Sequence, residues 1–245
     1  MLFRSLGLYP RMSLRGGRPE LQRGEHMEIA VRRDWGNGNS AEAAVYRDTF
    51  SNTAVTTMLP GGLYADGDVL PDLFSQTAAF NAGGYQTNGY RVSYHRKLSE
   101  SLQAGVGYVH SGILAAERDS LATTDPNELR SILKENTAHA VTAQLSAKAP
   151  RTKTWLASAY QWRSRNAVTA SDVFNTTADR ALPGLNVTVR QPLPQATYLP
   201  GKFEAMAEFR NMLAEGYVPI QTADGRRLFL IPSARSFRGG VNFIF

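Results

Sequence analysis

The sequence predicts an all-β fold, an antiparallel up-and-down transmembrane β-barrel of which this chain forms a part of about nine strands. Two observations predict it. Apolar residues recur at every second position in most of these segments, the spacing that places them on one face of a β-strand. The connections alternate between short and long, as in outer-membrane barrels with short periplasmic turns and long extracellular loops.

The first strand is predicted over 26–35, where the odd-numbered residues from Met27 to Trp35 are mostly apolar and the even-numbered ones, apart from Ala30, are polar or charged. The same alternation recurs in six later segments. The segments 41–50 and 152–162 also predict strands, but the sequence does not decide which of their faces is apolar. The seven segments with a decided apolar face are 26–35, 89–98, 102–111, 139–148, 185–191, 202–213 and 236–245.

The connections carry local signals of their own. Asp125 before Pro126 predicts the N-cap and first turn of a helix near 126–135. Asp224 and Gly225, between two apolar runs, predict a hairpin. Residues 1–24 are expected to form an irregular segment or an extracellular loop, and 25–245 the C-terminal part of the barrel. The short connections are 36–40, 99–101, 149–152 and 192–201, and the long ones are 57–87, 114–136, 163–184 and 214–235.

Composition narrows the class of protein. No run approaches the roughly 18 apolar residues of a membrane-spanning helix, and the absence of Cys excludes disulfide frameworks and thiolate metal sites. The net charge of +6 is spread without a basic motif, so no nucleic-acid partner is expected. Arg4, Pro10 and Arg11 interrupt any secretory signal. The chain is therefore expected either to stay inside the cell or to be a piece of a longer protein, and the strand pattern favours the second.

The polar strand faces carry charges of both signs, which indicates a watery or plugged barrel lumen. A soluble sandwich requires the reverse arrangement, with charges outside and an apolar core. Aromatic residues near strand ends, such as Trp35 and Phe203, are typical of the interfacial girdles of membrane barrels. The residues predicted to line the lumen are Glu28, Arg32, Arg91, His95, Arg190, Glu204, Glu208, Arg210 and Arg238.

The last segment, SFRGGVNFIF, ends on an aromatic residue preceded by alternating apolar positions. It resembles the assembly signal of outer-membrane barrels, carried here by Phe237, Val241, Phe243 and Phe245. The resemblance implies two partners, the barrel-assembly machinery and outer-membrane lipid. It also implies location in the outer membrane of a Gram-negative-type bacterium.

The longer stretch 203–245 resembles the C-terminus of TonB-dependent receptors, in the subgroup with a carboxypeptidase-regulatory-like domain. EFRNML (208–213) is similar to that family's penultimate strand, and Pro19, Glu20 and Glu28 are similar to its entry into a barrel strand. The resemblance implies uptake of an unidentified substrate. Contact with the energy-coupling TonB protein is implied only through a plug domain, which this chain lacks.

Two other hypotheses remain open: a free-standing small outer-membrane barrel with a structural or adhesive role, and a soluble all-β protein, which includes an enzyme. No catalytic, cofactor or metal site is predicted. The histidines His26, His95, His110 and His139 lack the spacing of a zinc helix. Glu204 and Glu208 lie about 13 Å apart along one strand, too far to act on one bond.

Nine antiparallel strands leave the first and the last running in the same direction. Closure by the chain alone would need a parallel seam between them. We therefore expect a curved open sheet whose concave face is charged.

Overall fold

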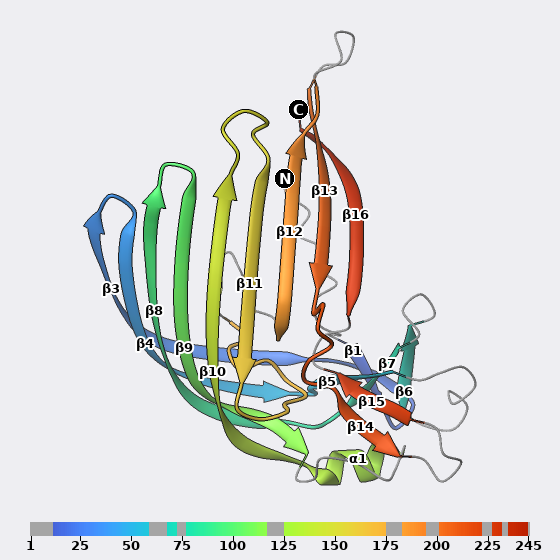
Figure 1. The fold of residues 1–245 in the computed structure, drawn as a ribbon. Helices are drawn as coiled ribbons and strands as arrows, with labels where there is room; N and C mark the ends of the chain where they lie inside the picture. The colour runs from blue at the N-terminus through green and yellow to red at the C-terminus, as the bar shows by residue number, and fades with distance from the viewer. Residues whose placement is uncertain are drawn as a thin grey trace.

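The computed structural model shows an all-β chain with one short helix (Figure 1). It describes residues 12–58, 68–72, 77–116, 125–174, 183–194, 201–221, 227–231 and 235–244.

A nine-stranded antiparallel sheet, the main sheet, forms most of the molecule. Each strand pairs with the strands before and after it in the set, which confirms the predicted meander of about nine strands. The two edge strands, β3 and β16, are not paired with each other, so the sheet is open. In chain order the strands are β3 (Arg23–Gly36), β4 (Asn39–Ser51), β8 (Tyr85–Ser99), β9 (Leu102–Ala116), β10 (Leu133–Lys148), β11 (Trp155–Arg163), β12 (Gly184–Pro192), β13 (Lys202–Arg210) and β16 (Ser236–Ile244).

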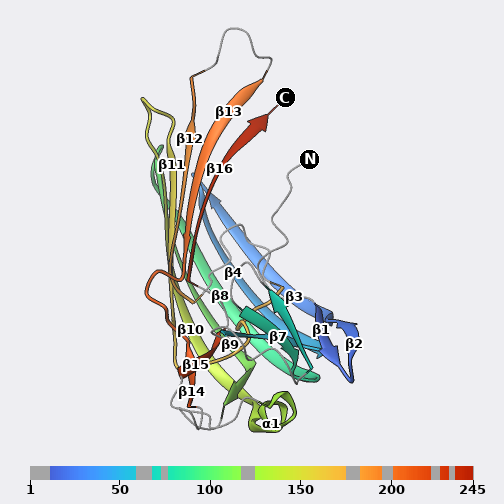
Figure 2. The same ribbon diagram turned by 90° about the vertical axis from the view of Figure 1, so that its right-hand side faces the viewer.

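The strands are joined by short connections at one end of the sheet, the short-turn end, which is uppermost in Figure 1. The β3–β4 turn has only two residues between its strands, Asn37 and Gly38, and their φ angles are 51° and 75°. Positive φ at both central positions is the type I′ geometry that matches strand twist. At the other end several strands run longer than the roughly 9–11 residues typical of a membrane-spanning strand, with 16 in β10. Their lower halves curve beneath the concave side (Figures 1 and 2).

The long connections build a second, five-stranded sheet beside these lower halves. The pairing of β14 with β15 agrees with the predicted hairpin, although its turn lies outside the described residues. The five strands, in sheet order, are β14 (Val218–Gln221), β15 (Arg227–Ile231), β5 (Ala54–Met58), β7 (Thr77–Asn81) and β6 (Val69–Asp72).

Residues 1–24 were expected to be an irregular segment or an extracellular loop, and the first alternative is wrong for residues 12–21. These residues form a hairpin of β1 (Met12–Arg15) and β2 (Arg18–Leu21). Its turn is Gly16-Gly17, with φ of 57° and 71°, a conformation in which glycine avoids the Cβ clash. Both turn amides donate to the Asp68 carboxylate, at 2.6 and 2.7 Å. These bonds lower the pKa of Asp68.

The predicted helix is present as α1 (Pro126–Ile132), and Asp125 caps it by accepting from the Asn127 amide at 2.8 Å. Among the described residues, no helix is long and apolar enough to cross a membrane. The main apolar core lies at the lower end, between the long strands, α1 and the second sheet. Its buried members are Phe50, Val55, Ala78, Phe80, Ala82, Tyr85, Leu114, Leu129, Leu133, Val168, Val218, Ile220 and Leu230.

The two faces of the main sheet differ sharply. The convex face is apolar and exposed, and it includes the predicted apolar side of each strand. The structure also decides the two open cases: Val45 and Leu156 point to the convex face, whereas Tyr46 and Ala157 are buried on the concave face. We call the exposed large apolar residues of the convex face the apolar band: Met27, Ile29, Val31, Trp35, Val45, Tyr90, Val92, Tyr94, Leu98, Val106, Val141, Leu145, Leu156, Trp162, Phe237, Val241 and Phe243.

The apolar band runs obliquely to the rows of paired residues. Phe237, the band member nearest the start of β16, begins a row of cross-strand partners that ends on β8 at Arg96, close to the other margin of the band at Leu98. The band therefore shifts along the strands from one edge of the sheet to the other. Such a shift is expected when tilted strands cross a flat apolar layer. The row is Phe237, Phe209, Val187, Ser158, Leu145, Ala104 and Arg96.

Candidate functional site on the concave face

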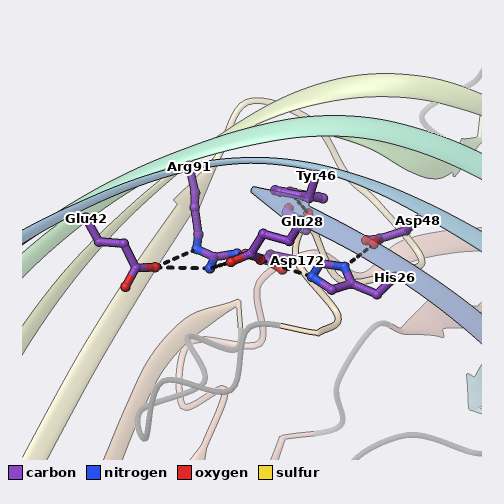
Figure 3. Close-up of polar contacts among 8 residues, drawn as sticks. His26, Glu28, Glu42, Tyr46, Asp48, Arg91 and Asp172 are labelled. Atoms are coloured by element: carbon purple, nitrogen blue, oxygen red, sulfur yellow. Dashed lines mark hydrogen bonds and ion pairs between the residues drawn. The ribbon is translucent and has the colours of Figure 1, made fainter. Parts of the chain in front are cut away.

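A network of ion pairs lies on the concave face, centred on Arg91 of β8 (Figure 3). Its guanidinium donates to both carboxylate oxygens of Glu28 on β3, each at 2.6 Å. It also donates to Oε1 of Glu42 on β4, from Nε at 3.2 Å and Nη2 at 3.0 Å. A third carboxylate, Asp172, lies 3.5 Å from Nη1. The Arg91 side chain is only 10% exposed, so the network surrounds a largely desolvated cation.

His26 of β3 extends this network. Its Nε2 lies 3.0 Å from Glu28 and its Nδ1 lies 2.5 Å from Asp48 of β4. Asp48 is almost fully buried, and Phe174 stacks on the imidazole with ring centroids 4.9 Å apart. Both ring nitrogens of His26 therefore face carboxylates.

Asp172 and Phe174 belong to the connection after β11, which folds over the concave face as an inner loop, residues 164–174. The loop begins against β10, where the Ser164 amide donates to the His139 carbonyl. It then crosses β9, where the Val168 amide donates to the Leu114 carbonyl at 2.9 Å and Thr169 Oγ1 accepts from the Leu114 amide at 3.0 Å.

The far part of the inner loop reaches the first strands of the main sheet. Tyr46 Oη donates to the Ser171 carbonyl at 3.2 Å, and Phe174 stacks on Phe50 with centroids 5.5 Å apart. With the Arg91–Asp172 ion pair, these contacts fasten the loop to β4 and β8. Four of its residues are almost wholly buried: Ala167, Val168, Thr169 and Ser171.

Local sequence explains why the side chains converge here. Alternation along β3, β4 and β8 places His26, Glu28, Glu42, Asp48 and Arg91 on one face. Gly89, directly opposite Tyr46, leaves room for the phenol ring, because a Cβ there would overlap the ring. The missing side chain thus lets the Tyr46 hydroxyl reach the inner loop.

The ladder places all nine residues predicted to line the lumen on the concave face, but they do not meet in one site. Glu28 and Arg91 meet in the network. Arg32 instead pairs with Asp34 at 3.2 Å, and the Arg190 guanidinium lies 5.1 Å from the Trp155 ring centroid. The others are spread along the sheet: His95 lies beside Gly105, Glu208 pairs with Arg210 at 2.8 Å, Glu204 accepts from Asn242, and Arg238 lies opposite Glu208.

Three of the four residues of the expected assembly signal lie on the convex face. Phe237 and Val241 are about two-thirds exposed, and Phe243 is partly covered by Phe203, with ring centroids 4.7 Å apart. Phe245 lies outside the described residues.

Sequence reasoning missed half of the network. Glu42, Tyr46 and Asp48 lie in the segment whose faces the sequence left undecided, although their even spacing in 41–50 was a usable signal. Asp172 had no signal, because nothing in a connecting segment indicates that it folds onto the sheet. His26 was expected to be an ordinary polar-face residue.

The chemistry of the network is that of a fixed ion-pair cluster. Each hydrogen-bonding atom of His26 is held by a carboxylate, so neither is directed at a nucleophilic hydroxyl. Among the described residues, no group of three or more His, Asp or Glu is arranged to hold a metal ion. What the cluster does in this structure is anchor the inner loop to the main sheet. Comparison with protein-family models, curated proteins and solved structures finds no match.

Proposed function

We propose that this chain is part of the wall of a transmembrane β-barrel in the outer membrane of a Gram-negative-type bacterium, with lipid on its convex face and water on its concave face. The observation that carries this proposal is the apolar band. Seventeen large apolar side chains lie exposed on one continuous face of the main sheet. Soluble monomers rarely expose apolar patches beyond a few hundred Å².

The free energy of covering the apolar band favours lipid over water as the medium around the convex face. Burying a large apolar side chain stabilises by about 1.5–3 kcal/mol, so covering a band of partly exposed residues is worth on the order of 20 kcal/mol. The opposite face carries the ion pairs and the inner loop, which suits a hydrated interior and not a second apolar layer. A backbone in lipid must be hydrogen-bonded throughout, and each interior strand of the main sheet is paired on both sides.

Aromatic residues mark both margins of the apolar band, as the girdles of membrane barrels do. At the short-turn end Trp35 lies against Tyr94, with ring centroids 6.4 Å apart. Toward the other end Tyr90 contacts Tyr108 and His110, at 5.9 and 5.2 Å. The oblique course of the band adds a third argument, because barrel strands tilt by about 35–45°.

The finer proposal is that the wall belongs to an uptake receptor of the TonB-dependent kind. It rests on the resemblance of residues 203–245 and of Pro19, Glu20 and Glu28 to that family. On this proposal the barrel takes up an unidentified substrate, and the energy-coupling protein acts through a plug domain outside this chain. An in-frame plug domain encoded upstream would support it, whereas an unrelated upstream gene would favour a free-standing barrel.

Site-specific fluorescence tests the membrane assignment directly, because the chain has no Cys and a single introduced thiol can be labelled cleanly. Val92→Cys and Ser93→Cys are matched positions, adjacent on β8 and pointing to opposite faces. After the full chain is refolded into vesicles, a bromolipid should quench the label at position 92 and leave the label at 93 largely unquenched. Equal quenching of both labels by a water-soluble quencher, with no bromolipid effect, would refute the assignment.

A further inference from the structure

The basic residues are spread along the sequence, but the fold gathers the excess positive charge at the short-turn end of the main sheet. The strand ends and turns there, residues 32–40, 95–103, 147–155, 189–194 and 201–205, contain nine Lys and Arg and three acidic residues. The whole chain has 27 basic and 21 acidic residues. The remaining 18 basic and 18 acidic residues therefore cancel, and the net +6 lies at this end.

Several of these cations border the apolar band on the convex face. Arg33 lies opposite Ala41 and Arg96 opposite Ala104, so both share the face of the band, and both are exposed. The Arg33 guanidinium lies 5.5 Å from the centroid of the Trp35 ring. This places a cation beside an aromatic residue at the margin of the band, the arrangement of an interfacial anchor.

Other cations lie in the turns immediately beyond the band. Arg151 and Lys153 are exposed in the β10–β11 connection. Two cations of this end have a carboxylate neighbour on their own segment, Arg32 with Asp34 and Lys97 with Glu100. We call the strand ends and turns of the short-turn end the basic rim. The basic rim therefore presents exposed positive charge next to an apolar surface.

We propose that this basic rim binds the headgroups of anionic phospholipids in the membrane leaflet next to the short-turn end. The inference rests on the proposed membrane function and deepens it by naming the lipid class and the side of the sheet. A cluster of four to eight Lys and Arg beside an apolar membrane surface has the charge and position that anionic headgroups need.

The test compares two variants of equal net charge. The rim variant carries Arg33→Gln, Arg96→Gln, Arg151→Gln and Lys153→Gln. The control variant carries Arg15→Gln, Arg18→Gln, Arg23→Gln and Arg165→Gln, which neutralises four exposed cations away from the short-turn end. The full chain and both variants are refolded into vesicles of phosphatidylcholine, with or without phosphatidylglycerol, and the membrane-bound fraction is measured by co-flotation at low and high salt.

We expect phosphatidylglycerol to raise the membrane partition coefficient of the unchanged chain at low salt. In vesicles that contain phosphatidylglycerol, the partition coefficient of the rim variant should be at least about tenfold lower than that of the unchanged chain. The control should lose much less, and high salt should remove the difference because exposed charges are screened. Equal losses in both variants, or no effect of phosphatidylglycerol on a chain that enters phosphatidylcholine vesicles, overturns the inference alone. A chain that stays folded and monomeric in water and enters neither kind of vesicle refutes the membrane function itself. Rim-dependent binding to an acidic polypeptide without any lipid effect would assign the rim to a protein partner and overturn the lipid proposal.

Discussion

Replacing Arg91 by Met should destabilise the folded chain by about 3 kcal/mol. The substitution keeps a long side chain and removes only the charge and its hydrogen bonds. Glu28, Glu42 and Asp172 would then face one another across the concave face without their shared cation.

The magnitude follows from burial. Removing one partner of a buried ion pair costs about 3–5 kcal/mol, because the other charge is left desolvated. Here Asp172 is 6% exposed, but Glu28 and Glu42 are 22% and 18% exposed. Partial hydration of these two carboxylates places the expected cost at the lower end of that range.

The assay is unfolding in urea of the full chain refolded into vesicles, followed by Trp fluorescence. Arg190→Met is the matched control, because Arg190 also lies on the concave face but contacts the Trp155 ring, a contact worth about 0.5–1 kcal/mol. Neutralising the carboxylates as well, by Glu28→Gln, Glu42→Gln and Asp172→Asn in the Arg91→Met chain, should restore at least half of the loss.

Two results would refute this reasoning. One is an Arg91→Met chain that is no less stable than Arg190→Met. The other is a neutralised chain that stays as unstable as Arg91→Met alone, because that would show that shape and not charge holds the network together.

Three further predictions test other parts of the fold. Val241→Arg, on the convex face of β16, should lower the stability of the inserted sheet by roughly 2–4 kcal/mol, whereas Asn242→Arg on the other face should be mild; equal tolerance in a vesicle-folding assay would contradict the assignment of faces. Gly89→Ala should displace the Tyr46 ring and raise the exposure of a fluorophore at Val173→Cys to a water-soluble quencher, whereas Gly107→Ala, whose added Cβ meets nothing nearer than 3.9 Å, should not. The lowered pKa of Asp68 means that its bonds to Gly16 and Gly17 stabilise the hairpin fully above the ordinary Asp pKa and are lost as the pH falls through the lowered value. The amide shifts of Gly16 and Gly17 should follow this titration, and a pH dependence that survives in Asp68→Asn would exclude the contact as its cause.

Strand alternation made much of the main sheet predictable. In β3 and β16 most of the large apolar residues occupy alternating positions, and the structure places those positions on one face. The apolar face of the segment 41–50 could not be predicted, because Ala43 and Ala44 lie on opposite faces with equal hydropathy. Only the neighbouring strands decide between the two faces. Gly16-Gly17 is typical of a hairpin turn, but this hairpin was not predicted, because no alternating apolar runs flank the two glycines.

The site was less predictable, because it depends on contacts between distant segments. Glu28 and Arg91 were each expected on a polar face, but their pairing needs the register of three strands. Asp172 could not be found, since its position depends on how the chain crosses the sheet after β11. Local pattern specifies faces, whereas the network arises from packing that no single segment encodes.

The inner loop also has a consequence for the order of folding. Tyr46 and Ser171 are 125 residues apart in the chain, so their bond is of very high sequence separation, and closing so long a segment in one step is slow. Pairing of β4 with β8, and of each later strand through β11, brings the two residues together in small increments. The loop can dock only after those strands have assembled in register, and its docking therefore reports that the first six strands of the main sheet are complete.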